Sequence, residues 1–325
     1  MKNSLSLFIR TTVAAFAAAV LLFSAGCGDA SRTAAPSVSE TGATRTISDA
    51  LGNDVTIPVR PERVLALSEA DLDAMLALGV TPAGACAGRG QASFPRYLGE
   101  ETAGMTLLGA LYRPSVDRIL QVDPDLILAG GWLDAGLEEQ LRRIAPVVRT
   151  HATGDGWRDA LRGVASALDR EAEAKAFLSR YDGRLEAVRA AVGAPGELEA
   201  SVVRWNPKGP AFMYADSFSR GVLNDIGFRV PEAQQVPGPA HSPVLSFESL
   251  DQIDADWLFL GTLSGEGEAA KTLEHALSHP AFARLRAATE GRVVRVDGSV
   301  WTSAGGPLAA LKILEDVEEA ARNGE

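Results

Sequence analysis

The sequence is poor in cysteine and histidine, and this limits the kinds of site it can build. Its 325 residues contain two cysteines, Cys27 and Cys86, and four histidines. Two cysteines cannot form the disulfide framework of a small secreted domain. His275 and His279 have the spacing of a metal-binding pair, but Pro280 follows directly and places them at a helix end. We therefore expect no metal site built from protein ligands.

Positive charge is also in short supply. The chain has 31 Lys and Arg residues against 42 Asp and Glu residues, which gives a formal net charge of −11. This balance argues against nucleic-acid binding and against electrostatic attraction to anionic lipid. After the N-terminal segment, no apolar run approaches the roughly 20 residues that a membrane-spanning helix needs.

Recognised catalytic motifs are missing as well. The chain has neither a Gly-x-Ser-x-Gly nucleophile elbow nor a phosphate-binding loop ending in Gly-Lys-Ser or Gly-Lys-Thr. Two acid pairs, Asp123 with Asp125 and Asp254 with Asp256, could be taken for an acid–base site. Each pair precedes an apolar strand, at the end away from the expected ligand edge, so we interpret them as turn and capping residues. The sequence thus predicts a protein that is not an enzyme.

The N-terminus is typical of a secretory signal, with basic residues ahead of an apolar run over residues 11–23. Small residues directly before Cys27 resemble the bacterial lipobox. That resemblance implies cleavage before Cys27 and a diacylglycerol on its sulfur; the alternative is a soluble secreted protein in which Cys27 is incidental. The residues that follow, up to about 45, are mostly small and polar, so they predict a flexible tether.

Beyond the tether, strand and helix patterns alternate. Residues 63–67 form an apolar run, Ser68 then caps a helix, and Asp71 stands three residues on, as in a capping box. This alternation predicts an α/β fold with mainly parallel sheets. Apolar residues at helical spacing over 157–192 predict one long helix or two abutting ones. The expected parts are a signal peptide at 1–26, lipidated Cys27 with its tether at 27–45, an N-terminal α/β lobe at 46–155, a linking backbone helix at 156–194 and a C-terminal α/β lobe at 195–325.

An internal repeat supports two similar lobes. Residues 115–130 align without gaps to residues 246–261, and in both copies a Ser begins a short helix. An acid follows two residues later, Asp117 in the first copy and Glu248 in the second, and Asp-x-Asp precedes an apolar strand that ends in Gly. The shared acids make chance agreement a poor explanation, so we expect two similar lobes with a ligand cleft between them.

Several stretches together resemble a known family. In chain order they are Asp49-Ala-Leu-Gly-Asn, Ile57-Pro, Pro61-Glu-Arg-Val-Leu, Ala77-Leu-Gly-Val-Thr-Pro, Val122-Asp-Pro-Asp-Leu-Ile, Ser217-Phe-Ser-Arg-Gly-Val-Leu-Asn-Asp-Ile-Gly, Leu245-Ser-Phe-Glu and Gly305-Gly-Pro-Leu-Ala-Ala. The region from about Thr44 onward is similar to the helical-backbone solute-binding proteins of ABC importers for ferric siderophores, haem and cobalamin. The resemblance implies two lobes joined by one long helix. Met213-Tyr214 with Ser217-Phe218 is most similar to the siderophore branch.

The resemblance also implies docking residues. Family members dock through one acid per lobe onto arginines of the permease, and Asp117 and Glu248 match those positions. Asp117 departs from the usual Glu by one methylene. The alternative is that an acid in the first helical turn only stabilises its helix, by about 0.3–1 kcal/mol.

Ligands of open α/β sheets bind beyond the carboxyl ends of the strands. Aromatic rings and arginines in those loops suit a bulky chelate with anionic oxygens. The candidates are Ser68, Arg89, Tyr112, Arg113, Trp132, Arg204, Trp205, Tyr214 and Trp301. Tyr112 and Arg113 rank first, because relatives commonly place ligand contacts there. Haem-binding relatives use a Tyr followed by an Arg in this loop, but with a different spacing to the docking acid.

These observations predict an exported, lipid-anchored binding component of an ABC importer, acting as a monomer with a permease and its ATPase subunits. The expected ligand is a ferric siderophore, a hydroxamate or a mixed chelate, which fills the iron shell itself, so no cofactor is expected. The membrane is that of a Gram-positive cell or one side of a Gram-negative envelope. Haem or a corrinoid is the nearest alternative; an exported α/β enzyme and a surface adhesin are more distant ones.

Overall fold

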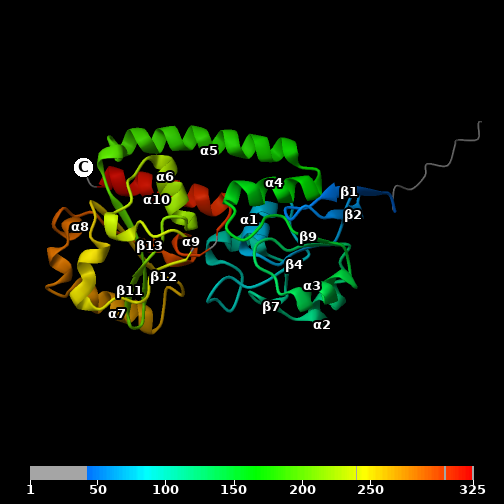
Figure 1. Cartoon of the computed structure of the whole chain (residues 1–325), viewed down its shortest axis with the longest axis horizontal. Coiled ribbons are helices and arrows are strands. Elements are labelled where there is room, and N and C mark those ends of the chain that lie inside the picture. Colours follow the sequence, from blue (N-terminus) through cyan, green and yellow to red (C-terminus); the bar gives the residue numbers. More distant parts are fainter. Residues whose placement is uncertain (1–41, 239, 304, 324–325) are drawn as a thin grey trace, which may run out of the picture. The chain divides into compact units, whose positions relative to one another are not determined.

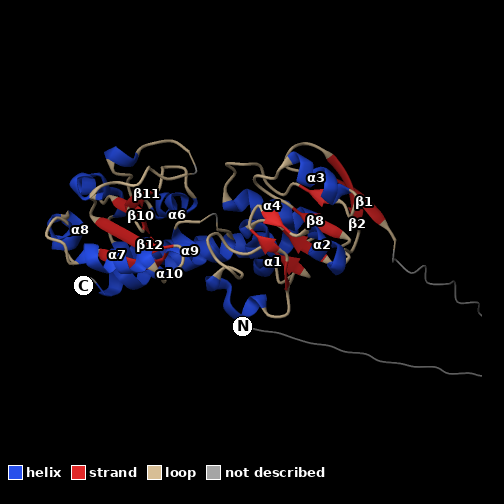
Figure 2. Ribbon diagram, turned by 90° about the horizontal axis from the view of Figure 1, so that it is seen from below, coloured by secondary structure: helices blue, strands red, loops and turns tan. Residues whose placement is uncertain are grey.

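The computed structural model describes residues 42–323, apart from 239 and 304. Cys27, the signal peptide and most of the expected tether lie outside the described residues. The described chain forms two α/β halves, each with its own sheet, as the sequence predicted (Figures 1 and 2). No helix in these ranges is long and apolar enough to cross a bilayer.

The N-terminal half begins with a hairpin, β1 (Thr44–Ser48) and β2 (Asp54–Pro58). The Asp49 carboxylate closes the turn by accepting the N–H groups of Leu51 and Asn53, each at 2.9 Å. The Arg45 guanidinium donates to the carbonyl oxygens of residues 166 and 167, at 2.7 and 2.9 Å. The first element of this half therefore starts at Thr44, two residues before the expected boundary.

A five-stranded parallel sheet fills this half, in the order β5-β4-β3-β8-β9. The apolar runs of β3 and β8 are fully buried, as expected for central strands of a covered sheet. The bounds are β3 Val64–Ala66, α1 Glu69–Ala77, β4 Gly84–Ala85, η1 Arg96–Thr102, β5 Thr106–Leu107, β6 Gly109–Ala110, β7 Arg113–Pro114, α2 Val116–Val122, β8 Leu126–Leu128, α3 Ala135–Arg142 and β9 Val147–Val148.

The C-terminal half contains a four-stranded sheet in the order β11-β10-β12-β13, parallel except for the edge strand β11. The bounds are η2 Pro195–Glu197, β10 Ala200–Asn206, β11 Gly209–Phe212, α6 Phe218–Ile226, η3 Glu232–Gln234, η4 Phe247–Ile253, β12 Trp257–Thr262, α7 Glu268–Leu277, η5 Phe282–Arg284, α8 Arg286–Thr289, β13 Val293–Asp297 and α9 Gly298–Trp301.

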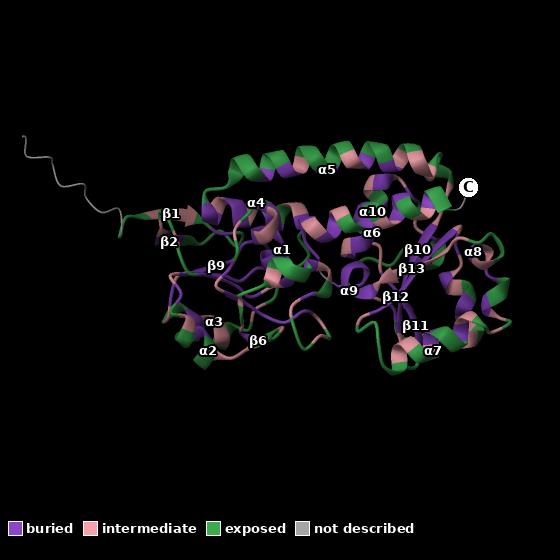
Figure 3. Ribbon diagram, turned by 180° about the vertical axis from the view of Figure 1, so that it is seen from behind, coloured by how far each residue is buried: buried purple, intermediate pink, exposed green. Residues whose placement is uncertain are grey.

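Three helices connect the halves: α4 (Trp157–Leu168), α5 (Glu171–Val192) and α10 (Pro307–Asn323). Asp169 adopts a left-handed conformation, φ +57°, and separates α4 from α5, so the structure has two abutting helices. α4 packs on α1 in the N-terminal half, α5 runs across both halves (Figure 1), and α10 packs against α5 and contacts α1 and α6. The expected linking helix at 156–194 is therefore narrowed to α5, which buries Phe177 and Tyr181 and exposes its outer face (Figure 3).

The sequence repeat has a structural counterpart. Asp125, before β8, accepts the N–H of Glu62 at 2.7 Å, next to the start of the parallel neighbour β3. Asp256, before β12, accepts the N–H of Glu199 at 2.7 Å, next to the start of β10. In each half, an acid at the amino end of one strand holds its neighbour in place. These two acids therefore have structural contacts at the amino ends of the strands, and they link neighbouring strands where the sequence suggested turn and capping residues.

Candidate functional site

A cavity of about 680 Å³ lies between the two halves. Its lining includes Arg89, Tyr112 and Trp132 from the N-terminal half, and Arg204 and Ser303 from the C-terminal half. This volume is in the range of pockets that bury a small organic ligand. The sequence-based prediction assigned residues from both halves to one ligand site, and four of these candidates line this cavity.

An aromatic pair and an arginine form one side of the cavity. Arg89 Nη2 donates to Tyr112 Oη at 2.7 Å, and its guanidinium carbon lies 5.6 Å from the ring centroid. The Tyr112 ring meets Trp132 edge to face, with 5.5 Å between centroids. Tyr112 is 42% exposed and Trp132 is 56% exposed. Large rings left open to solvent at a cavity are suited to contact a partly apolar ligand.

Arg204 extends from β10 on the opposite side and is largely buried. Its Nε donates to Thr302 Oγ1 at 3.1 Å, and Nη2 donates to the Thr302 carbonyl. Burial, together with the charge of Arg89, lowers the pKa of Arg204 to about 10, and Glu69 opposes the shift. The guanidinium remains protonated at neutral pH, so both halves contribute positive charge to the cavity, through Arg89 and Arg204 among others.

Glu69, the first residue of α1, links the two sides. Its Oε1 accepts the backbone N–H of Arg89 at 2.7 Å, and its Oε2 accepts the Ser303 hydroxyl at 2.6 Å. Glu69 is only 5% exposed. The sequence placed Glu69, with Ser68, in a loop beyond a strand, but Glu69 was not selected as a ligand contact. Thr302 and Ser303 were not singled out, although their neighbour Trp301 was a candidate.

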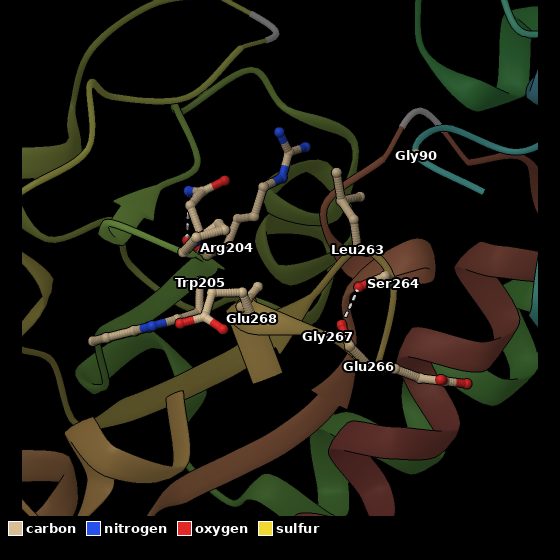
Figure 4. Close-up of a pocket in the computed structure, with 11 residues that line it drawn as sticks. Gly90, Arg204, Trp205, Leu263, Ser264, Glu266, Gly267 and Glu268 are labelled. Carbon is tan, nitrogen blue, oxygen red and sulfur yellow. Dashed lines mark hydrogen bonds between the residues drawn. The ribbon is translucent and has the colours of Figure 1, made fainter. Parts of the chain in front are cut away.

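A second hollow of about 610 Å³ adjoins the first, and Arg204 lines both. Its other lining residues include Gly90, Leu263, Ser264 and Glu268 (Figure 4). Ser264 Oγ donates to the carbonyl of Glu266 at 2.6 Å, which holds the loop at the end of β12. The two hollows together offer a space larger than either one.

Comparison with known proteins agrees with this architecture. The family model described as periplasmic binding protein matches residues 64–300. The chain belongs to this family. It is 30% identical over 310 residues to a probable siderophore-binding lipoprotein of Bacillus subtilis, YfiY, covering 93% of this chain and 95% of the relative.

Two further relatives of this periplasmic binding protein have related names. An achromobactin-binding periplasmic protein of Dickeya dadantii is 28% identical over 261 residues, covering 79% of this chain and 85% of the relative. Among solved structures, Staphylococcus aureus SirA complexed with staphyloferrin B has a TM-score of 0.74 and 27% identity, covering 86% of this chain and 99% of that one. The two-lobe α/β fold predicted from the sequence is therefore confirmed.

Two predicted tryptophan contacts do not face the main cavity. Trp301 is fully buried; it stacks on Phe259 with 4.4 Å between centroids, and its Nε1 donates to Asp316 at 2.8 Å. Trp205 alternates with Arg204 along β10, so its ring lies on the opposite side of the strand (Figure 4). Its ring is 1% exposed in the core of the C-terminal half. Both are corrected to core residues, although Trp205 also borders the second hollow.

Three further candidates lie outside the cavity lining. Ser68 Oγ accepts the N–H of Asp71 at 3.0 Å, so it caps α1. Arg113 is exposed and belongs to the short hairpin strand β7. Tyr214 packs beside Phe212, with 6.1 Å between ring centroids. Ser68 and Tyr214 thus have local contacts, and a ligand contact through any of these three side chains stays a prediction.

The two expected docking acids occupy equivalent places. Asp117 is the second residue of α2, and Glu248 is the second residue of η4. Both are exposed, and neither takes part in an ion pair among residues 42–323 as described. The Ser caps differ: Ser115 Oγ accepts the N–H of Arg118 at 3.4 Å, whereas Ser246 makes no such bond, so the expected second cap is absent from η4.

Histidines line the cavity without forming a metal cluster. His151 and His241 both contribute to the lining. The described part of the chain contains no group of three or more His, Cys, Asp or Glu that could hold a metal ion. His279 Nδ1 accepts the N–H of Ala281 at 3.1 Å, just beyond the end of α7, where the sequence placed it.

Proposed function

We propose that this periplasmic binding protein captures a ferric siderophore for an ABC importer. The observation that carries the proposal is the cavity between the halves, to which each half brings an arginine and one side brings two open aromatic rings. The names of the relatives support the same ligand class. The protein acts as a binding component rather than as an enzyme.

The cavity chemistry matches a ferric chelate. A siderophore surrounds its iron, so the protein contacts the organic shell and the charge of the complex rather than the metal. Tyr112 and Trp132 provide aromatic surface for that shell, and Arg89 and Arg204 provide donors for anionic oxygens. The volume of about 680 Å³, with the second hollow beside it, accommodates a ligand of this size.

We further propose that Cys27 carries the lipid that holds the protein to the outer face of the cytoplasmic membrane, or to the periplasmic side of a Gram-negative envelope. The monomer then delivers its cargo to a permease with ATPase subunits. Asp117 and Glu248, both exposed and one from each half, are the proposed contacts to permease arginines.

Titration of tryptophan fluorescence tests the ligand class. A panel of ferric hydroxamate, carboxylate, mixed and catecholate siderophores is added to the purified protein, with haem and cobalamin alongside. We expect saturable quenching by at least one ferric siderophore at micromolar concentration or below. Quenching by haem or cobalamin alone would reassign the ligand, and no response to any ferric chelate would reject the proposal.

A further inference from the structure

Hydrogen bonds, joined by the peptide link between Thr302 and Ser303, form a path beside the cavity from one half of the molecule to the other. It starts at Arg89, whose backbone N–H donates to Glu69 at 2.7 Å. Glu69 accepts the Ser303 hydroxyl at 2.6 Å, and the adjacent Thr302 accepts two bonds from Arg204. The path therefore connects two cavity arginines that are 115 positions apart in sequence and belong to different halves.

The positive and negative charges along this path do not cancel. The two guanidinium groups and the carboxylate of Glu69 together carry one net positive charge. Glu69 contacts Arg89 through the backbone N–H of that residue. Arg204 is 7% exposed and Glu69 is 5% exposed, so solvent screens these charges poorly. Burial is the main cause of the lowered pKa of Arg204; the charge of Arg89 adds to the shift and that of Glu69 opposes it.

The donors of the two arginines are only partly used. Arg89 Nε is buried and has no hydrogen-bond partner within the described ranges, while Nη2 binds Tyr112. Arg204 uses Nε and Nη2 for Thr302. Among the described residues neither arginine uses its Nη1 group in a hydrogen bond, so an incoming anion would meet one such donor from each half.

The other charged residues of the cavity have protein partners. These contacts are the ion pairs Arg158–Asp225 at 2.9 Å and Arg162–Asp159 at 3.0 Å, the bond from the Ala152 N–H to Asp155 at 2.7 Å, and the bond from the Gly238 N–H to Asp216 at 2.7 Å. Arg158 and Arg162 are thus paired with carboxylates, whereas Arg89 and Arg204 are the cavity arginines that form no ion pair among the described residues.

We propose that Glu69 is a specificity-determining residue that sets the charge of the chelate accepted by the cavity. It acts as a buried negative charge beside the two arginines, and its bonds to the Arg89 backbone N–H and to Ser303 hold together the two segments from which Arg89 and Arg204 meet an anionic chelate that presents carboxylate oxygens. Planar guanidinium groups match carboxylates in geometry, and a neutral chelate would leave them buried without a charged partner. This inference rests on the proposed function and narrows its ligand class.

Two variants test separately the negative charge of Glu69 and its hydrogen-bonded link to Ser303 of the other half. Glu69→Gln keeps the shape and the capacity to bond both Arg89 and Ser303, but removes the negative charge. Ser303→Ala breaks the link between the halves and leaves the charge in place. Glu171→Gln is the matched control, because Glu171 is also the first residue of a helix, α5, but is exposed.

Dissociation constants are measured for each protein with three probes: ferric dicitrate, the ferric complex of a citrate-dihydroxamate siderophore, and a neutral ferric trihydroxamate. The wild type should prefer an anionic probe. Glu69→Gln should bind the anionic probes about 3- to 10-fold more tightly and the neutral probe unchanged, because the ligand no longer competes with a buried carboxylate. Ser303→Ala should weaken all bound probes by a similar factor, and Glu171→Gln should match the wild type.

A preference of the wild type for the neutral probe would overturn the inference and leave the proposed function intact. An equal effect of Glu69→Gln on anionic and neutral probes would do the same. If Glu69→Gln does not fold, the salt dependence of wild-type binding tests the inference instead. The affinity for the anionic probes should fall between 50 and 500 mM NaCl, while the affinity for the neutral probe should stay constant. Equal salt dependence would overturn the inference, whereas failure of every ferric probe, including catecholates, would reject the proposed function itself.

Discussion

Tyr112 occupies a backbone conformation that favours glycine. Its φ of +65° lies in the left-handed region, at the turn between the short strands β6 and β7. For a residue with a side chain this conformation costs about 1–2 kcal/mol. The turn aims the Tyr112 ring at Trp132 and Arg89, so the cost is consistent with a role in the cavity.

Replacing Tyr112 with Gly should separate stability from binding. The relief of strain and the extra freedom of the unfolded chain offset each other, so the unfolding free energy should stay within about 1 kcal/mol of the wild type. The affinity for the ferric chelate should fall at least tenfold. Tyr112→Phe, which keeps the ring and the backbone cost, is the control. Chelate affinity unchanged in Tyr112→Gly would remove Tyr112 from the binding site.

Trp132 should report ligand binding. Its ring is the most exposed of the large apolar side chains that the structure describes and it lines the cavity. We expect Trp132→Phe to lose the largest single share of ligand-induced fluorescence quenching, with the other tryptophans retaining the rest. Quenching of undiminished amplitude in this variant would place the ligand elsewhere.

At the residue scale, sequence patterns located the right loops but could not choose among their side chains. The rule that ligands bind beyond the carboxyl ends of strands led to Arg204 and Trp132, which line the cavity. It also led to Trp301, which lies in the one-turn helix α9 and turns into the core. The direction of a side chain in such a loop depends on local dihedral angles that the strand pattern does not encode.

At the scale of elements, Asp73 joins α1 to α10. Its carboxylate accepts the N–H groups of Leu308 and Ala309, at 2.6 and 3.0 Å, and the Tyr97 hydroxyl at 2.6 Å. The first turn of α10 is thus capped by a residue of the other half of the chain. Burial raises the pKa of Asp73 to about 6, against an ordinary value of 3.8, although these bonds oppose the shift.

This raised pKa predicts a pH-dependent contribution to stability. The folded protein binds the proton more tightly than the unfolded chain, so the added stability is complete below about pH 4 and is lost as pH rises through 6. We expect the wild type to lose on the order of 2–3 kcal/mol relative to Asp73→Asn between pH 4 and pH 7, measured by denaturant unfolding. If the difference in unfolding free energy between the wild type and Asp73→Asn stays constant across this range, the prediction is contradicted. As the control, the difference between the wild type and Glu171→Gln should not change with pH.

The short helices α2 and η4 carry Asp117 and Glu248, the two proposed docking acids. Glu248→Lys should abolish iron uptake by cells that carry the importer, because it places like charges against the permease arginines, while chelate affinity stays unchanged. Glu232→Lys is the matched control, since Glu232 is also exposed and begins the short helix η3 of the same half. Normal uptake by Glu248→Lys would exclude docking through this acid.

Helical spacing predicted the region of α4 and α5 but left open whether it was one helix or two. Asp169 decides between them through its left-handed conformation, which a polar residue can adopt more readily than most. The role of α10 was not foreseen, because its capping by Asp73 joins residues about 235 positions apart. Patterns within a short window carry no information on such a distant partner.

For the whole molecule, the tether and lipid anchor remain a prediction, since Cys27 lies outside the described residues. Cys27→Ser should shift the protein from the detergent phase to the aqueous phase in a phase-separation assay. Its affinity for the ferric chelate should not change, because the described binding region begins well after this residue. Retention in the detergent phase would contradict lipid attachment at Cys27.

The paired helices α5 and α10 have a consequence for the way cargo leaves. Two packed helices resist bending more than a single flexible strand would, so we expect the halves to make only small excursions by themselves. A binding protein of this kind would lose its cargo slowly while it diffuses. Release would then require the importer to do work on the protein by moving the two halves apart at their outer ends. The paired helices would return the empty protein to its original form.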